Sequence, residues 1–231
     1  MLKPVNENLD GVTITDVEDH KLISNADLNR DLKNLKNFDA TENRNNFYGN
    51  PFLYHFQFKN LLNCKREKGK TIYELYADKS AWSKLIDSAR KRNRGGRTAA
   101  GNVFECFRIN LGSIVMFKST TAKYLYKKYS VKSVLDPTAG WGGRMLGAWA
   151  LGINYTGIDT NTNMKSAYDR MMEYLGNYSE FNNPLIEEKQ SGKLEMIWQS
   201  ALDVDFSKLE YDFVLTSPPY VNLEIYEHMA V

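Results

Sequence analysis

The chain has 231 residues, with 30 Lys and Arg against 28 Asp and Glu, a formal net charge of +2, and 42% apolar residues. This composition predicts a globular protein with a buried core, large enough for one large or two small domains. A net charge this small excludes a general attraction to phosphate, so nucleic-acid binding would depend on a local basic patch.

The sequence contains two cysteines, Cys64 and Cys106, with no CxxC pair, and three histidines. We therefore expect neither a disulfide framework nor a metal site, and a reducing cytoplasm fits this cysteine usage. The N-terminus lacks an apolar leader segment, and no run approaches the roughly 20 apolar residues that span a bilayer. These features predict a cytoplasmic protein that is not inserted in a membrane.

The N-terminal part of the chain predicts little regular structure before one amphipathic helix. Residues 1–50 are polar, rich in Asn and Asp, and end in TENRNNFYGNP, which predicts irregular structure or turns. The stretch KSAWSKLIDSARKRN then spaces Trp82, Leu85, Ile86 and Ala89 at helical intervals. We expect residues 1–100 to form a polar arm and a mostly helical extension, and residues 101–231 to form a second domain.

The predicted helix runs into a basic segment, RKRNRGGR. Cations at a helix C-terminus are favourably placed by the helix dipole, so a solvated helix end is one interpretation. The other is a loop that contacts nucleic-acid phosphates. The candidate phosphate-binding residues are Arg90, Lys91, Arg92, Arg94 and Arg97.

From residue 102 onward, short apolar runs alternate with amphipathic stretches, which predicts an α/β fold with a mostly parallel sheet. A first strand is expected at Ser133–Asp136, followed by a glycine-rich turn and a helix through Met145 to Leu151. A second strand should end at Asp159. KLEMIWQS and YDFVLTSPPY supply a third and a fourth strand, the latter followed by a polar loop.

The segment DPTAGWGGR lies where the first strand should give way to a helix. Small residues let the backbone approach a ligand closely, and a helix N-terminus presents free N–H groups to an anionic part of it. Asp159 ends the next strand, where dinucleotide-binding folds place the carboxylate that binds ribose hydroxyls. Tight packing of the turn and a capping role for Asp159 remain alternatives, and the pair does not distinguish nicotinamide from other nucleoside cofactors.

The segment TSPPY follows the fourth predicted strand. Two consecutive prolines remove two backbone donors and fix φ, so the segment is expected to leave the sheet as a stiff extended loop with free carbonyls. The alternative is an ordinary rigid turn.

Together, DPTAGWGGR and SPPY resemble the two signatures of the amino-methyltransferases that use S-adenosylmethionine to modify exocyclic nitrogens of nucleobases. The resemblance covers residues 107–231 and implies a Rossmann-like class I methyltransferase sheet with helices on both faces. It also implies S-adenosylmethionine as cofactor and DNA as the nucleic-acid partner.

The resemblance assigns cofactor-binding roles to several residues. The turn residues would line the methionine and ribose part of the cofactor: Asp136, Pro137, Thr138, Ala139, Gly140, Gly142 and Gly143. Asp159 would bind the ribose hydroxyls, and Ser200 or Asp203 would lie near the adenine. Phe117, Lys118 and Ser119 are candidates beside the methionine end, although a capped amphipathic helix explains that segment equally well.

The same resemblance assigns the catalytic loop to Ser217, Pro218, Pro219 and Tyr220. The Ser217 hydroxyl and the Pro218 carbonyl would accept hydrogen bonds from the target amino group and direct its lone pair toward the methyl group. Tyr220 would stack on a base rotated out of the duplex. Ser at the first loop position favours cytosine N4 over adenine N6.

The sequence departs from the family pattern at its C-terminal end, because the family sheet continues through three further strands. We therefore expect a C-terminally incomplete domain, completed by a second chain or a missing segment, unless residues 1–100 substitute for it. RNA or a protein glutamine as acceptor, and a cofactor-binding fragment inactive without a partner, remain alternatives. A phage or restriction-modification setting fits the family.

Overall fold

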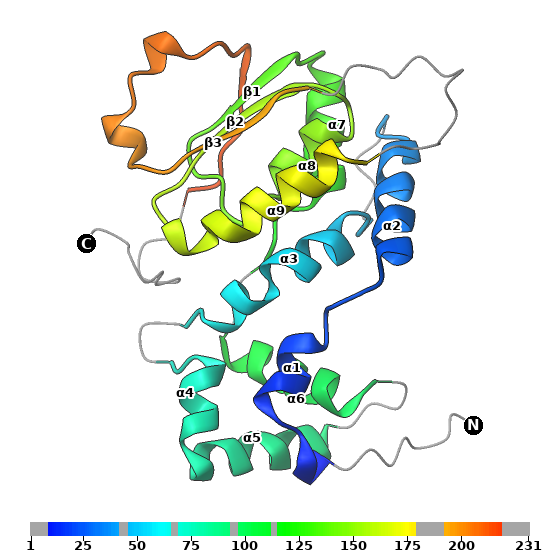
Figure 1. Cartoon of the computed structure of the whole chain (residues 1–231), viewed down its shortest axis with the longest axis vertical. Coiled ribbons are helices and arrows are strands. Elements are labelled where there is room, and N and C mark those ends of the chain that lie inside the picture. The colour runs from blue at the N-terminus through cyan, green and yellow to red at the C-terminus, as the bar shows by residue number, and fades with distance from the viewer. Residues whose placement is uncertain are drawn as a thin grey trace. The chain divides into compact units, whose positions relative to one another are not determined.

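A computed structural model of the chain describes residues 9–41, 46–65, 69–92, 97–111, 115–178 and 192–218. These residues form two compact units. Unit one contains the described residues up to Leu22 and between Phe58 and Val115, and unit two contains those of Ile23–Gln57 and from Met116 to residue 218. Helix α3 (Asn50–Leu62) contributes residues to both units (Figure 1).

Unit one is helical. Its elements are η1 (Leu9–Gly11), α1 (Ile14–Asp19), α4 (Ile72–Ala77), α5 (Lys79–Lys91) and α6 (Ala99–Leu111). The predicted amphipathic helix is confirmed as α5, whose Leu85, Ile86 and Ala89 are buried. Asp78 begins this helix by accepting hydrogen bonds from the backbone N–H groups of Ser80 and Ala81.

Unit two contains a four-stranded parallel sheet in the order β3-β2-β1-β4, so the predicted α/β class is confirmed. The strands are β1 (Ser133–Asp136), β2 (Asn154–Ile158), β3 (Leu194–Ile197) and β4 (Phe213–Val214). The first strand has the predicted bounds, because its buried apolar run ends where the glycine-rich turn begins. This arrangement is compatible with a Rossmann-like α/β fold.

Helices pack beside this sheet (Figure 1). They are α7 (Ser119–Lys128), α8 (Gly143–Trp149) and α9 (Lys165–Gly176), with short 3-10 turns η2 (Thr162–Met164), η3 (Ala201–Asp203) and η4 (Phe206–Lys208). The helix expected over Met145–Leu151 thus begins two residues earlier, at the glycines of the turn. Among the described residues, no helix is both long enough and apolar enough to cross a membrane.

The expectation of irregular structure over the first 50 residues is wrong for α2 (Asn25–Asn37). Ser24 caps this helix, and Leu28, Leu32 and Leu35 are fully buried at helical spacing. The polar residues that suggested irregular structure occupy its outer face, so the average composition concealed a narrow apolar stripe.

Two buried charged groups hold α2 in unit two. Asp31 of α2 accepts hydrogen bonds from the backbone N–H groups of Gly49 and Phe52, at 3.0 and 3.1 Å, and so caps the start of α3. Lys123 of α7 donates to the carbonyls of Leu35, Lys36 and Phe38, at 2.8, 2.6 and 2.8 Å. The segment 23–57 therefore belongs to the sheet unit, while the boundary expected between residues 100 and 101 falls inside α6 of unit one.

Candidate functional site

The candidate site lies at the carboxyl ends of β1 and β4. In the strand order β3-β2-β1-β4, strand β1 pairs with β2 on one side and with β4 on the other. Open parallel sheets bind ligands outside the carboxyl ends of their strands, at the point where the strand order reverses. The two motifs singled out in the sequence follow these two strands, so the sheet brings them to this one point.

Glycines in the turn after β1 occupy positions that a residue with a side chain would strain, and Gly140, with φ +57°, is one of them. Gly142 has φ +90°, a backbone conformation that residues with a side chain rarely adopt. A Cβ on Gly143 would collide with the backbone carbonyl oxygen of Phe117. Leu53 of α3 and Met171 of α9 pack against the same turn, so its path is fixed by the fold before any ligand arrives.

The Asp136 carboxylate is bound by other side chains of the protein. Its carboxylate is fully buried and accepts hydrogen bonds from Arg144 Nε and from the Tyr155 hydroxyl, both at 2.6 Å. Burial raises the pKa of Asp136, and the Arg144 guanidinium opposes that shift. Arg144 also donates to the carbonyl of Thr138, so the ion pair ties both ends of the turn together.

Thr138 connects the two predicted motifs directly. Its hydroxyl lies 2.7 Å from the hydroxyl of Thr216, and it accepts a 3.3 Å hydrogen bond from the backbone N–H of Ser217. The predicted cofactor turn and the start of the predicted catalytic loop are therefore in contact. Ser217 and Pro218 are exposed there, whereas the predicted residues Pro219 and Tyr220 lie outside the described residues.

Asp159 follows β2 and faces the same turn. One carboxylate oxygen accepts the backbone N–H of Gly140 at 2.8 Å, and the other accepts that of Asn161 at 2.9 Å. Burial raises the pKa of Asp159, and these two backbone hydrogen bonds oppose the shift. The Tyr168 hydroxyl donates to the Gly140 carbonyl at 2.8 Å, which fixes the turn from its other side.

The candidates after β3 differ in what they contact. Ser200 caps η3 by accepting the backbone N–H of Leu202 at 3.2 Å, and Asp203 is exposed. Trp198, which the sequence analysis did not select, is half-buried and packs edge-on against Tyr168 with ring centres 5.5 Å apart. Its position directly after β3 places an aromatic face at the edge where the other candidates lie.

The segment before α7 also approaches the turn. The Phe117 ring lies 5.1 Å from the guanidinium carbon of Arg144, and the Lys118 ammonium lies 4.6 Å from the Phe47 ring centre. Ser119 is fully buried, and among the described residues its hydroxyl has no hydrogen-bond partner. The remaining turn residues, Pro137, Ala139 and Gly140, complete the loop between Asp136 and Gly142.

The predicted phosphate-binding residues of unit one are not equivalent. Arg90 forms ion pairs with Asp10 and Asp87, and Arg97 lies 3.7 Å from a carboxylate oxygen of Glu105. Lys91 and Arg92 are exposed, and no ion pair joins them to a carboxylate within the described ranges. Arg94 lies outside the described residues.

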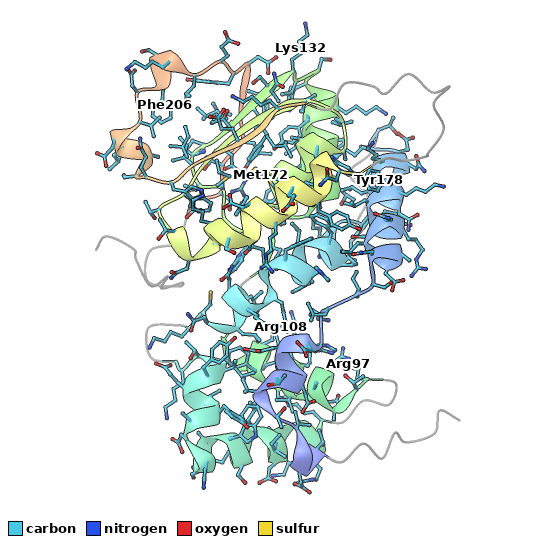
Figure 2. All side chains as sticks on the ribbon, in the orientation of Figure 1. Arg97, Arg108, Lys132, Met172, Tyr178 and Phe206 are labelled. Atoms are coloured by element: carbon cyan, nitrogen blue, oxygen red, sulfur yellow. The ribbon has the colours of Figure 1, made fainter. Side chains whose placement is uncertain are left out.

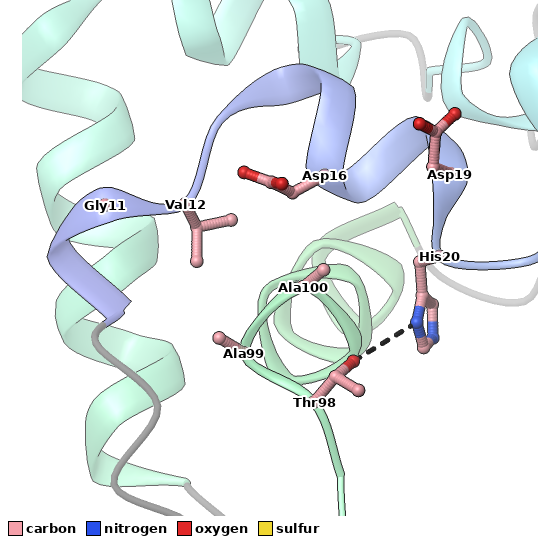
Figure 3. Close-up of a pocket in the computed structure, with 8 residues that line it drawn as sticks. All are labelled: Gly11, Val12, Asp16, Asp19, His20, Thr98, Ala99 and Ala100. Atoms are coloured by element: carbon pink, nitrogen blue, oxygen red, sulfur yellow. Dashed lines mark hydrogen bonds between the residues drawn. The ribbon is translucent and has the colours of Figure 1, made fainter.

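A cavity of about 550 Å³ in unit one is lined by two acidic side chains, Asp16 and Asp19, and by His20 (Figure 3). Asp16 forms a capping box with Thr13, and the Thr98 hydroxyl accepts the backbone N–H of Gly101 at 3.1 Å. His20 lies 3.4 Å from that hydroxyl, and burial, with Lys21 and Arg97, lowers its pKa to about 4. The histidine is therefore neutral at physiological pH, and the Asp16 and Thr98 side chains of this cavity are explained by helix capping.

Several residues at the sheet edge were not predicted from the sequence. Arg144 stands inside the quoted motif, and its charge beside Asp136 could have suggested the buried pair. Tyr155, Tyr168 and Trp198 follow no motif, and only the packing of the strands and α9 brings them to the turn.

Comparisons of the chain with protein-family models, with curated proteins and with solved structures found no significant match.

Proposed function

We propose that the chain is an S-adenosylmethionine-dependent methyltransferase that acts on an exocyclic amino group of DNA, with cytosine N4 favoured over adenine N6. The observation that carries the proposal is the contact of Thr138 with Thr216 and Ser217. It places the glycine-rich turn beside the SPP segment at the reversal point of a parallel sheet. An enzyme that joins a nucleoside cofactor to a second substrate requires such a meeting of two loops.

The residues at the turn fit the cofactor. The space that a side chain on Gly140 would fill is open, since the nearest atoms to a Cβ there are 3.8 and 4.0 Å away. Each Asp159 oxygen accepts one backbone hydrogen bond, which leaves lone pairs for ribose hydroxyls. The buried Asn161 Oδ1 lacks a hydrogen-bond partner among the described residues, as expected of a group that awaits a ligand donor.

Bound S-adenosylmethionine would supply an electrophilic methyl group on its sulfonium. The chain must then orient an amino nitrogen whose lone pair is delocalised into the base ring. The exposed Ser217 hydroxyl oxygen and Pro218 carbonyl would accept the amino hydrogens, which concentrates electron density on the nitrogen. The hydrogen bond from Ser217 N–H to Thr138 holds this loop against the cofactor turn, so orientation is set by the protein.

The identity of the acceptor base rests on Ser217, because a serine at this position favours cytosine N4 in the resembling family. A duplex substrate also requires the target base to be rotated out of the stack.

The test is methyl transfer from labelled S-adenosylmethionine to unmodified DNA, with mass spectrometry of the digested nucleosides. We expect N4-methylcytosine from the wild-type chain and a loss of about 10²–10³-fold in rate for Ser217→Ala. Ser207→Ala, on η4, is the matched control and should keep the wild-type rate. Calorimetry should show unchanged cofactor affinity for Ser217→Ala, and transfer only to RNA or protein would refute the DNA assignment.

A further inference from the structure

Unit one contains a second cavity, of about 210 Å³, at the C-terminal end of α5. It is lined by Arg92, Arg97, Asn102, Glu105, Cys106 and Ile109. We propose that this cavity and the outer face of α5 bind consecutive phosphates of a DNA backbone. The inference deepens the proposed function and rests on it for the choice of DNA, but the binding itself does not require methyl transfer.

The cavity carries an excess of positive charge. Glu105 accepts two hydrogen bonds from Arg108, at 3.0 and 3.3 Å, whereas Arg97 approaches the same carboxylate only to 3.7 Å. The Arg97 and Arg108 side chains are labelled in Figure 2. The two hydrogen bonds from Arg108 occupy more of the acceptor capacity of the Glu105 carboxylate than the longer contact from Arg97 does. Arg97 therefore retains donors for an anion, and Arg92, which also lines the cavity, adds a second guanidinium.

The outer face of α5 continues this positive surface. Ser80, Lys84, Asp87 and Lys91 are exposed and lie three or four residues apart, so they form one stripe along the helix, with the exposed Ser83 next to Lys84. The negative charge of Asp87 is compensated by Arg90. Within the described ranges no ion pair joins Lys84 or Lys91 to a carboxylate, and serine hydroxyls beside lysines are common phosphate donors.

Arg90 distinguishes this surface from a simple basic run. It is followed directly by Lys91 and Arg92, yet its guanidinium contacts Asp10 and Asp87. Its charge serves the packing of η1 against α5, while the charges of Lys91 and Arg92 remain available to a ligand. The helix dipole alone would favour all three equally, so it does not explain the difference in pairing.

The larger cavity of unit one does not suit phosphate. Asp16 and Asp19 line it, and the histidine there is neutral at physiological pH. The two cavities therefore differ in sign of charge, and only the smaller one attracts an anion.

The experiment measures binding of a fluorescein-labelled DNA duplex by anisotropy, between about 50 and about 200 mM salt. The test variants are Arg92→Gln with Arg97→Gln for the cavity, and Lys84→Gln with Lys91→Gln for the helix face. Each pair should raise the dissociation constant about tenfold or more and lower the slope of log K against log salt by about 1–2, since each phosphate contact contributes about 0.9.

Matched controls separate specific contacts from net charge. Arg90→Gln combined with Asp87→Asn, on the same helix end, removes a paired cation together with its anion and should leave the salt slope unchanged. Lys193→Gln with Lys208→Gln removes the same charge from unit two and should also leave it unchanged. Arg92→Lys should retain the slope, and thermal unfolding of every variant identifies any that fail to fold.

The outcomes are distinct for the two proposals. Wild-type affinity in both test pairs would overturn the phosphate surface and leave methyl transfer standing. Binding that depends on Arg92 and Arg97, without any methylated nucleoside, would retain the surface and refute the proposed function. Tighter binding of single-stranded RNA than of the duplex would overturn the assignment to a DNA backbone.

Discussion

The glycine-rich turn of unit two and the outer face of α5 in unit one both contain cations beside a sequence motif, but they treat charge in opposite ways. At the turn, Arg144 is buried against Asp136 and the Thr138 carbonyl. On α5, Lys84, Lys91 and Arg92 face solvent. The buried cation is used to shape a loop, whereas the exposed cations are left for a partner.

This difference shows that the role of a basic residue near a motif depends on the groups that it contacts in the structure. Arg90 shows this most directly, because it belongs to the basic run in sequence but to an ion-pair cluster in structure. A buried cation whose partner is removed has a large free-energy cost, while an exposed one has little. Substitutions in the two regions should therefore separate by size of effect.

The largest effect is expected for Arg144→Leu. It leaves the buried carboxylate of Asp136 without its counter-charge, so the free energy of unfolding should fall by about 3–5 kcal/mol. Arg90→Leu removes an exposed arginine and should cost less than about 1 kcal/mol. Denaturant unfolding of both variants measures the contrast, and equal losses would contradict it.

A second contrast uses lysines. Lys123→Met removes the donor to three carbonyls at the end of α2 and should lower the free energy of unfolding by about 2–3 kcal/mol. Lys84→Met, on the exposed face of α5, should change it by less than about 0.5 kcal/mol. A Lys123→Met protein as stable as the wild type would show that α2 is held by its leucines alone.

A smaller effect is expected for the link between the two loops. Thr138→Val removes the hydroxyl that contacts Thr216 and Ser217 and should slow methyl transfer about tenfold, the value of one neutral hydrogen bond. Thr138→Ser keeps the hydroxyl and should restore the rate. A loss in Thr138→Ser equal to that in Thr138→Val would point to packing instead of the hydroxyl contacts.

The smallest effect is a pH dependence of cofactor binding. Burial raises the pKa of Asp159, so its carboxylate becomes protonated at a higher pH than the ordinary aspartate value of 3.8. Protonation removes acceptors for ribose hydroxyls, and affinity should fall as the pH drops through that raised pKa. Calorimetric titration of the cofactor at a series of pH values tests this prediction. The Asp159→Asn variant should bind the cofactor more weakly than the wild type, and its affinity should lack this pH dependence.

The sequence predicted the sheet better than the helices around it. Strand β1 and the two loops were predictable because an apolar run, a glycine turn and paired prolines are local signals, and parallel strands bring their carboxyl ends together. The α2 helix was missed because three leucines among polar residues form a weak stripe. Tyr155, the second partner of Asp136, could not be predicted, because it lies on a neighbouring strand and only the strand register places it there.

The contacts of Lys123 affect the order in which parts of the chain fold during synthesis. Its ammonium bonds to Leu35, which lies 88 positions earlier, so α2 leaves the ribosome long before the residue that secures it. Until α7 is synthesised, the carbonyls of Leu35, Lys36 and Phe38 lack this donor. Closing so long a loop delays the gain from its contacts. We therefore expect α2 to dock late in folding. In Lys123→Met the lost stability should then appear mainly as a faster unfolding rate, with the refolding rate little changed.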